Sequence, residues 1–384
     1  MREEYTNARL SIIVSGDRQM KIGIIGLSNS GKTTVFNALT RQNLETTIYP
    51  TTSGDPAIGV VKVPDARLDK LSEIIKPRKT THATVEYIDY IGLTKGDATQ
   101  NRKVFDLIKD VDAIVHVARA FENDAVVHPM NSVNPLRDVE TVELELIFGD
   151  LELVEKRLRR MEEASKKGKK PGESEKRLLL KCRNALEKEI PLRDIDFNEE
   201  EQKSIKHLQF ISRKPEVIVF NIGEKDLNTE KPRNLQNAAE RYFKDKKDKY
   251  KNLSLSLCGK IEMEIAGLSP EDATLFLDDL GIKEPALNRL IHVCYDVLGL
   301  ISFFTYVGNE VKAWTIPKGT GALAAAGKIH SDIERGFIRA EVISSEDFFA
   351  AGNIHAAKEK GILRLEGKTY EVKDGDIINF RFNV

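Results

Sequence analysis

Short apolar runs alternate with amphipathic stretches from Met20 to about Arg137. This alternation is typical of βαβ units, in which helices connect the strands of a parallel sheet. The amphipathic stretch Asn101–Lys109 fits the helix of one such unit, because an apolar run lies on each side of it. We therefore predict an α/β fold with a mostly parallel sheet. Its strands are expected at Lys21–Gly26, Ala57–Val63, Thr84–Asp89 and Ala113–Ala118.

The chain becomes densely charged from about Asp138 to Leu208, and its apolar residues recur at spacings of three and four. That spacing places them on one stripe of a helix. The segment Lys166–Gly172 interrupts the pattern, and a second helix is predicted over Ser174–Leu186. Because a strand-like run resumes at Pro215–Asn221, the helical hairpin is an insertion into the α/β domain. The stripe consists of Leu144, Ile147, Leu151, Val154 and Leu158.

Beyond about Leu300 the apolar period changes to two, which is typical of short strands in a compact β-rich domain. We expect residues 1–19 to be a disordered leader or an over-called start, because Met20 directly precedes the first strand. The predicted domains are 20–137 with 209–299, 138–208, and 300–384. The C-terminal strands are expected at Phe303–Val307, Val311–Ile316, Phe337–Val342, Thr369–Val372 and Ile377–Phe382.

Composition narrows the class of protein. Lys and Arg number 59 against 60 Asp and Glu, so any contact with nucleic acid must come from a local patch. Three widely separated cysteines favour a reduced, cytoplasmic location. No apolar run approaches the length of a membrane-spanning helix, so no membrane partner is expected. The 7 histidines show no metal-ligand spacing and are expected to be structural.

The strongest motif is Gly26-Leu-Ser-Asn-Ser-Gly-Lys-Thr-Thr, which follows an apolar strand and opens a helical segment. It matches the P-loop pattern G-x-x-x-x-G-K-[ST], whose backbone N–H groups wrap nucleotide phosphates. In this motif Lys32 reaches the β- and γ-phosphate oxygens, and the Thr33 hydroxyl ligates Mg²⁺. The predicted phosphate-binding residues are Gly26, Ser28, Asn29, Ser30, Gly31, Lys32, Thr33 and Thr34.

A second motif, Asp-x-x-Gly, follows the strand that ends at Asp89. In switch-type NTPases this Asp holds Mg²⁺ and the Gly amide, here that of Gly92, contacts the γ-phosphate. Lys32, Asp89 and Gly92 are therefore the predicted catalytic residues. Between the two motifs, Thr51, Thr52 and Ser53 each carry a hydroxyl that is able to complete the Mg²⁺ shell; the alternative is a plain Pro/Gly turn. Thr33, Ser53 and Asp89 are the predicted metal ligands.

The base-reading motif is altered. Guanine-specific NTPases carry N-K-x-D after this strand, whereas this chain has Asn221-Ile222-Gly-Glu224. Glu is one methylene longer than Asp, so the bidentate geometry suited to guanine should be lost. Lys225-Asp226 resembles the missing pair but is out of register. The third base-side element is expected at Cys258 and Gly259, after the strand Leu253–Leu257.

Together these motifs resemble the YchF type of Obg-related P-loop NTPases, also called Obg-like ATPases, over Met20–Val384. The resemblance rests on the P-loop, on Asp89-Tyr-Ile-Gly-Leu-Thr-Lys-Gly and on Asn221-Ile-Gly-Glu. It also rests on Arg339-Ala-Glu-Val-Ile, on Arg364-Leu-Glu-Gly-Lys and on Asp374-Gly-Asp-Ile-Ile-Asn-Phe-Arg-Phe-Asn-Val, which is similar to a TGS domain. The resemblance implies a G domain with an inserted coiled-coil arm, a C-terminal β-grasp domain, ATP bound in preference to GTP, and association with the ribosome.

The chain departs from the family pattern at several positions. The family usually has Pro at Ser28, Phe near Thr51 and Thr near Ser53. After Gly92, where many GTPases place a water-orienting Gln, stands Leu93, so intrinsic hydrolysis should be slow. Asn29 occupies the position that holds an activating K⁺ in related NTPases, and we hypothesise stimulation by K⁺.

The expected function is that of a slow Mg²⁺-dependent ATPase that acts as a nucleotide-dependent switch on the ribosome. The run Lys166–Lys170 is either a solvated loop or a contact for rRNA phosphate. One alternative is a non-enzymatic, ATP-gated interaction protein, which Leu93 favours. Another is a GTP-preferring translational GTPase, which Lys225-Asp226 would favour. The oligomeric state stays open.

Overall fold

The computed structural model describes residues 19–44, 56–167, 172–244 and 253–383. They group into two compact units. The α/β unit comprises Lys21–Val60 and Glu86–Leu290, and the C-terminal unit joins Val61–Val85 to Ile291–Val384. The expected leader falls outside the described residues except for Gln19. Among the described helices, none has both the length and the apolar character needed to cross a bilayer.

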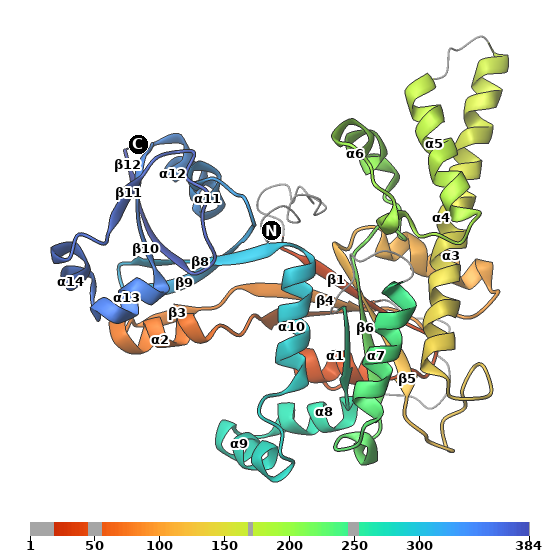
Figure 1. Ribbon diagram of the computed structural model, residues 1–384, viewed down its shortest axis with the longest axis horizontal. Helices are drawn as coiled ribbons and strands as arrows, with labels where there is room; N and C mark the ends of the chain where they lie inside the picture. The colour runs from red at the N-terminus through yellow and green to blue at the C-terminus, as the bar shows by residue number, and fades with distance from the viewer. Residues whose placement is uncertain (1–18, 45–55, 168–171, 245–252, 384) are drawn as a thin grey trace. The chain divides into compact units, whose positions relative to one another are not determined.

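A six-stranded sheet in the order β2-β4-β1-β5-β6-β7 forms the centre of the α/β fold (Figure 1). The pairings of β1 with β4 and β5, of β5 with β6, and of β6 with β7 are all parallel. The carboxyl ends of β4, β1, β5, β6 and β7 therefore meet at one edge of the sheet, where ligands bind in such folds. The strands are β1 (Lys21–Ile25), β2 (Ala57–Lys62), β4 (Thr84–Asp89), β5 (Ala113–Ala120), β6 (Glu216–Ile222) and β7 (Ser254–Leu257).

Of the helices that follow these strands, α3 (Ala98–Ile108) covers the predicted amphipathic stretch Asn101–Lys109 except for its last residue. Helix α1 packs against α8, and α3 packs against α4 (Pro135–Lys166). At the second contact, a Cβ built on Gly149 would come within 2.8 Å of the Phe105 ring, so the close approach needs glycine. The helices are α1 (Lys32–Thr40), α3 (Ala98–Ile108), α7 (Lys231–Lys244), α8 (Gly259–Gly267), α9 (Pro270–Asp279) and α10 (Ala286–Val297).

The predicted helical hairpin is present as α4 (Pro135–Lys166) and α5 (Glu173–Leu186), which lie side by side in Figure 1. Helix α4 begins three residues before the expected Asp138, because the Asn134 side chain accepts a hydrogen bond from Arg137 N and proline suits the first turn. Of the predicted stripe, Ile147, Val154 and Leu158 are buried, whereas Leu144 and Leu151 are half-buried. The chain then passes through η1 (Leu192–Asp194), α6 (Glu199–Ile205) and η2 (Lys206–Leu208).

Buried charges fasten the base of this arm to the sheet. Arg193 pairs with Glu143 of α4 and, at 2.7 Å, with Glu216 of β6. The Glu216 carboxylate also lies 2.8 Å from His116 Nδ1, and its pKa is lowered to about 2 although burial opposes this, since Arg193 and His116 stabilise the anion. Each buried charge therefore has a partner, as a low-dielectric interior requires.

The C-terminal unit contains a second six-stranded sheet, in the order β11-β10-β12-β8-β9-β3. Strand β12 is central, parallel to β8 and antiparallel to β10, which is the arrangement of the expected β-grasp fold. Its elements are β8 (Leu300–Val307), β9 (Glu310–Pro317), α11 (Ala322–Ile329), α12 (Ser331–Arg335), β10 (Phe337–Ser344), α13 (Ser345–Ala351), α14 (Ile354–Glu359), β11 (Arg364–Glu366) and β12 (Asp376–Phe382).

The predicted strand Thr369–Val372 is wrong, and the edge strand is Arg364–Glu366 instead. The backbone of this segment is used at the start of α11. The carbonyls of Lys368 and Tyr370 accept hydrogen bonds from Leu323 N and Ala322 N, and Val372 N donates to Thr320 O. These first-turn N–H groups have no partner within their own helix, so the segment satisfies them rather than a sheet ladder.

Residues from the first half of the chain complete this sheet, which the sequence did not predict. Strand β3 (Lys79–Thr81) pairs in parallel with β9, and α2 (Ala66–Ile75) precedes it. Arg67 of α2 forms a bidentate pair with Asp374, at 2.8 and 3.2 Å, and also binds Asp65. The segment between β2 and β4 is thus an integral part of the C-terminal unit.

Candidate nucleotide-binding site

The P-loop has the expected strand–loop–helix context, between β1 and α1. Gly26 has φ 150° and Gly31 has φ 91°, values that favour glycine. A Cβ on Gly26 would lie 2.3 Å from Val117 O, and one on Gly31 would lie 2.1 Å from Asn221 Nδ2. Both glycines are therefore fixed by backbone conformation and by close neighbours, and Thr34 lies in the first turn of α1.

Lys32 is buried, and its Nζ donates a hydrogen bond to Leu27 O at 2.9 Å. Burial lowers the pKa of this ammonium to about 8, and the carboxylate of Asp89 partly opposes the shift. A desolvated cation at the start of a helix offers strong electrostatic binding to a phosphate, because little water competes with the ligand.

Thr33 and Asp89 meet at the carboxyl ends of β1 and β4. Thr33 Oγ1 donates to Asp89 Oδ2 at 2.7 Å, and burial raises the pKa of Asp89 although Lys32 and Thr33 oppose the shift. Asp89 Oδ1 is buried and has no hydrogen-bond partner among the described residues. This unsatisfied oxygen fits a hard divalent cation such as Mg²⁺. The described residues contain no group of three or more His, Cys, Asp or Glu side chains that could hold a metal by themselves, so phosphate oxygens and water would have to complete the shell.

Gly92 lies directly against the P-loop. A Cβ built on it would come within 2.7 Å of Ser28 N and Cα, so no other residue fits here without movement. Leu93 N donates to Gly26 O at 3.0 Å, and Gln100 Nε2 donates to Gly92 O at 3.0 Å. The Leu93 side chain is fully buried in the core, so the residue after Gly92 packs the fold.

Asn221, near the end of β6, links the P-loop to the segment that follows β7. Its Nδ2 donates to Ser30 O at 3.0 Å, and its Oδ1 accepts a hydrogen bond from Gly259 N at 3.0 Å. The neighbouring Cys258 is a buried free thiol whose pKa is raised by burial. The side-chain amide of Asn221 thus fixes the P-loop and the loop after β7 at one position.

The other base-side residues do not converge in the same way. Ile222 is buried in the apolar cluster around β6, so its side chain belongs to the core. Glu224 is exposed, and its Oε2 lies 3.2 Å from Lys260 Nζ. Asp226, in the alternative Lys225-Asp226 pair, is bound to Lys231 at 2.8 Å.

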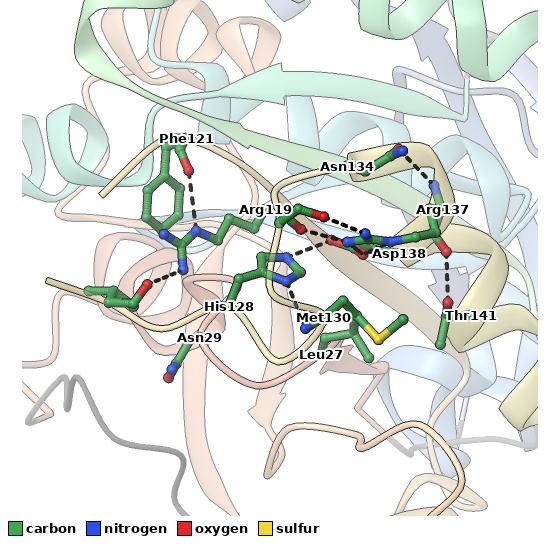
Figure 2. A network of polar contacts seen from close by, with 12 residues as sticks. Leu27, Asn29, Arg119, Phe121, His128, Met130, Asn134, Arg137, Asp138 and Thr141 are labelled. Atoms are coloured by element: carbon green, nitrogen blue, oxygen red, sulfur yellow. Dashed lines mark hydrogen bonds and ion pairs between the residues drawn. The ribbon is translucent and has the colours of Figure 1, made fainter. Parts of the chain in front are cut away.

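The loop after β5, which the sequence did not single out, also borders the site (Figure 2). A Cβ built on Gly31 would lie 3.8 Å from the Phe121 ring, and the Asn29 side chain donates to Val127 O at 2.9 Å. Arg119 donates to the carbonyls of Phe121, Asn123 and Val126 and covers the Phe121 ring at 4.5 Å. The sequence signal that could have indicated this loop is Phe121, an aromatic residue that directly follows a central strand at its carboxyl end.

His128 ties this loop to the first turn of α4. Its Nδ1 accepts a hydrogen bond from Met130 N at 3.0 Å, so Nε2 carries the proton and donates to Asp138 at 2.8 Å (Figure 2). Arg137 binds the other oxygen of the same carboxylate. The loop is therefore held both at the P-loop and at the arm.

Part of the predicted site lies outside the described residues. This applies to Thr51, Thr52 and Ser53, and to most of the basic run Lys166–Lys170.

A P-loop, a following Asp-x-x-Gly and an Asn at the end of β6, all at one edge of a parallel sheet, define a P-loop NTPase of the GTPase class. A family model described as a 50S ribosome-binding GTPase matches residues 21–147. The C-terminal model of the YchF GTPases, described as a protein of unknown function, matches residues 300–383.

Two curated relatives are both named ribosome-binding ATPase YchF. One, from Bacillus subtilis, is 44% identical over 365 residues, covering 94% of this chain and 99% of its own length. The other, from Escherichia coli O157:H7, is 41% identical over 367 residues, covering 95% of this chain and 99% of its own. The solved YchF GTPase of Schizosaccharomyces pombe is 28% identical with a TM-score of 0.78, covering 96% of this chain and all of its own. The chain belongs to the YchF family.

Membership in a P-loop NTPase family implies a general requirement for Mg²⁺. The pairing of Thr33 with Asp89 fits this requirement.

Proposed function

We propose that this protein binds ATP with Mg²⁺, hydrolyses it slowly and acts as a nucleotide-dependent switch on the ribosome. The observation that carries the proposal is the cluster of Lys32, Thr33 and Asp89, in which a buried ammonium stands beside an unsatisfied carboxylate oxygen. The curated relatives named ribosome-binding ATPases support the assignment of nucleotide and partner.

In this proposal each residue of the cluster has a separate task. Lys32 binds the β- and γ-phosphate oxygens, and the P-loop amides from Gly26 to Thr33 surround the phosphates. Thr33 and Asp89, with Ser53, hold Mg²⁺, which neutralises charge on the phosphates. The Gly92 amide senses the γ-phosphate.

Slow hydrolysis follows from the residue after Gly92. Because Leu93 is buried, no side chain at this position orients the attacking water. We further propose that K⁺ at Asn29 stimulates turnover, and that equal rates in KCl and NaCl would contradict this.

The proposed preference for ATP over GTP rests on the altered base-side motif. Glu224 is one methylene longer than the Asp that reads guanine, so the bidentate geometry suited to guanine is lost, and Ile222 offers no charged stem to cover the base. Asn221, Cys258 and Gly259 would face the base, and the Phe121 ring, which Arg119 covers on one side, would supply an apolar contact.

The division of tasks between domains also belongs to the proposal. In this division, residues 21–60, 86–137 and 209–290 of the α/β unit bind the nucleotide in the cytoplasm, and the arm (138–208) and the C-terminal unit (61–85 with 291–384) engage the ribosome. The basic run Lys166–Lys170, which begins at the last residue of α4, would contact rRNA phosphate.

Single-turnover hydrolysis with the full chain tests the proposal. We expect slow cleavage of ATP that ribosomes accelerate by at least about 10-fold, since partners of switch NTPases add at least that much. The Lys32→Ala variant should show neither the slow cleavage of ATP nor its acceleration by ribosomes. Unchanged rates despite ribosome binding would support the passive, ATP-gated interaction protein instead, and faster cleavage of GTP than ATP would support the translational GTPase.

A further inference from the structure

Two carboxylates follow Asn221 closely, and each is paired with a lysine from a different helix. Glu224 lies 3.2 Å from Lys260 of α8. Asp226 lies 2.8 Å from Lys231 of α7. Both acids belong to the short helix η3 (Glu224–Asp226), which directly follows the end of β6 and Gly223.

Lys260 lies next to the residues that connect the proposed base site to the P-loop. It directly follows Gly259, whose N–H binds Asn221 Oδ1, the same side chain that holds the P-loop at Ser30 O. Glu264, one turn later on α8, lies 4.0 Å from Lys260 and adds a second anion. Hydrogen bonding to Glu224 raises the pKa of Lys260, so the ammonium is charged at neutral pH.

The hydrogen-bonding groups of the two purines indicate how these ion pairs affect the choice between guanine and adenine. Guanine presents two donors on its Watson–Crick edge, N1–H and the 2-amino group, and a free carboxylate in that plane accepts both. Adenine presents the N1 lone pair there, which a free carboxylate repels. A carboxylate that is already bound to an ammonium group neither accepts the guanine hydrogen bonds nor repels the adenine N1. Such pairing therefore removes an attraction that favours guanine and a repulsion that disfavours adenine.

We infer that Lys260 and Lys231 are specificity-determining residues that disfavour guanine by holding Glu224 and Asp226 in ion pairs. The inference rests on the proposed preference for ATP. It assigns discrimination to two lysines outside the altered N-x-x-E motif itself. Because all four side chains are at least a quarter exposed, each pair contributes modestly, and we expect about a 2- to 5-fold effect for each.

Displacement of a fluorescent ATP analogue by unlabelled ATP, GTP and ITP from the full chain tests this inference. In Lys260→Ala and in Lys231→Ala, the ratio of GTP to ATP dissociation constants should fall about 2- to 5-fold, and the two changes should add in the double variant. GTP should gain more than ITP, because ITP keeps N1–H but lacks the 2-amino group.

Matched variants separate this effect from general damage. Lys260→Arg keeps the ion pair and should keep the wild-type ratio. Adding Glu224→Gln to Lys260→Ala removes the freed carboxylate and should restore it. Lys103→Ala, on the exposed face of α3, serves as the surface-lysine control.

The outcomes distinguish the two levels of the account. A wild-type protein that prefers ATP, with ratios unchanged in the lysine variants, would overturn the inference and leave the proposed function standing. A wild-type protein that prefers GTP would overturn the proposed base preference and, with it, the inference.

Discussion

At the scale of single residues, Lys32 shows how burial sets the chemistry of the site. Its pKa is lowered to about 8 because the ammonium is desolvated, even though Asp89 favours the charged form. Phosphate binding requires the charged form, and a bound triphosphate would raise this pKa again. Nucleotide affinity therefore depends on pH in a range in which most lysines do not titrate.

We predict that ATP binds about 10-fold more weakly at pH 9 than at pH 7, because protonation of Lys32 must then accompany binding. Isothermal titration at the two pH values measures this, together with the proton uptake in buffers of different ionisation enthalpy. Lys32→Ala should bind weakly at both values without the pH dependence. Equal wild-type affinity at both would contradict a lowered pKa at Lys32.

At the scale of elements, Asp150 is the residue that anchors the arm helix α4 to the chain leading into β6. Its carboxylate accepts hydrogen bonds from Ile211 N at 2.9 Å, Ser212 N at 2.7 Å and Ser212 Oγ at 2.6 Å. Burial raises the pKa of Asp150 to about 6 despite these bonds. The native state thus binds a proton more readily than the unfolded chain between about pH 4 and 6.

Asp150→Ala should lower the free energy of unfolding by about 2 to 4 kcal/mol at pH 7, because it leaves three buried donors without an acceptor. Denaturant unfolding gives this value. The loss should be larger near pH 4, because the raised pKa of Asp150 adds native stability there that disappears as the pH rises to about 6.

Glu152, one half-turn further along α4, provides the matched control. It pairs with Arg102 at the exposed surface, so Glu152→Ala should cost less than about 1 kcal/mol. Equal losses in the two variants would show that burial does not decide the effect.

Sequence patterns anticipated the elements whose signals are local. The P-loop, the strand ending at Asp89 and the two arm helices each have their own local pattern, and in the structure they begin within three residues of the predicted positions. Strand β3 has only three residues, and its pairing with β9 depends on residues more than 200 positions away. Segment Thr369–Val372 has a strand-like sequence, but its backbone groups are used by α11.

The candidate site divides in the same way. The P-loop and Asp-x-x-Gly motifs predicted that Lys32, Thr33 and Asp89 belong to one site, because phosphate and Mg²⁺ binding require these residue types at these spacings. Phe121 and the lysine partners of Glu224 and Asp226 carry no motif, and only the fold brings them to the same edge of the sheet.

At the scale of the whole molecule, chain connectivity links the two units through the switch region. The chain leaves the α/β unit after Val60, contributes α2 and β3 to the C-terminal unit, and returns at Glu86. Three residues later it reaches Asp89, the proposed Mg²⁺ ligand. The strand that ends at this proposed Mg²⁺ ligand is therefore covalently continuous with the unit proposed to engage the ribosome, and we propose that this continuity couples the two functions.

Sedimentation of the full chain with ribosomes tests the central claim, a nucleotide-dependent switch on the ribosome, most directly. We predict that the fraction that sediments with ribosomes differs at least about 5-fold between a non-hydrolysable ATP analogue and ADP, which corresponds to about 1 kcal/mol of coupling. Lys32→Ala should lose this difference. Equal sedimentation in ATP analogue, ADP and no nucleotide, or none in any of the three, would contradict the account.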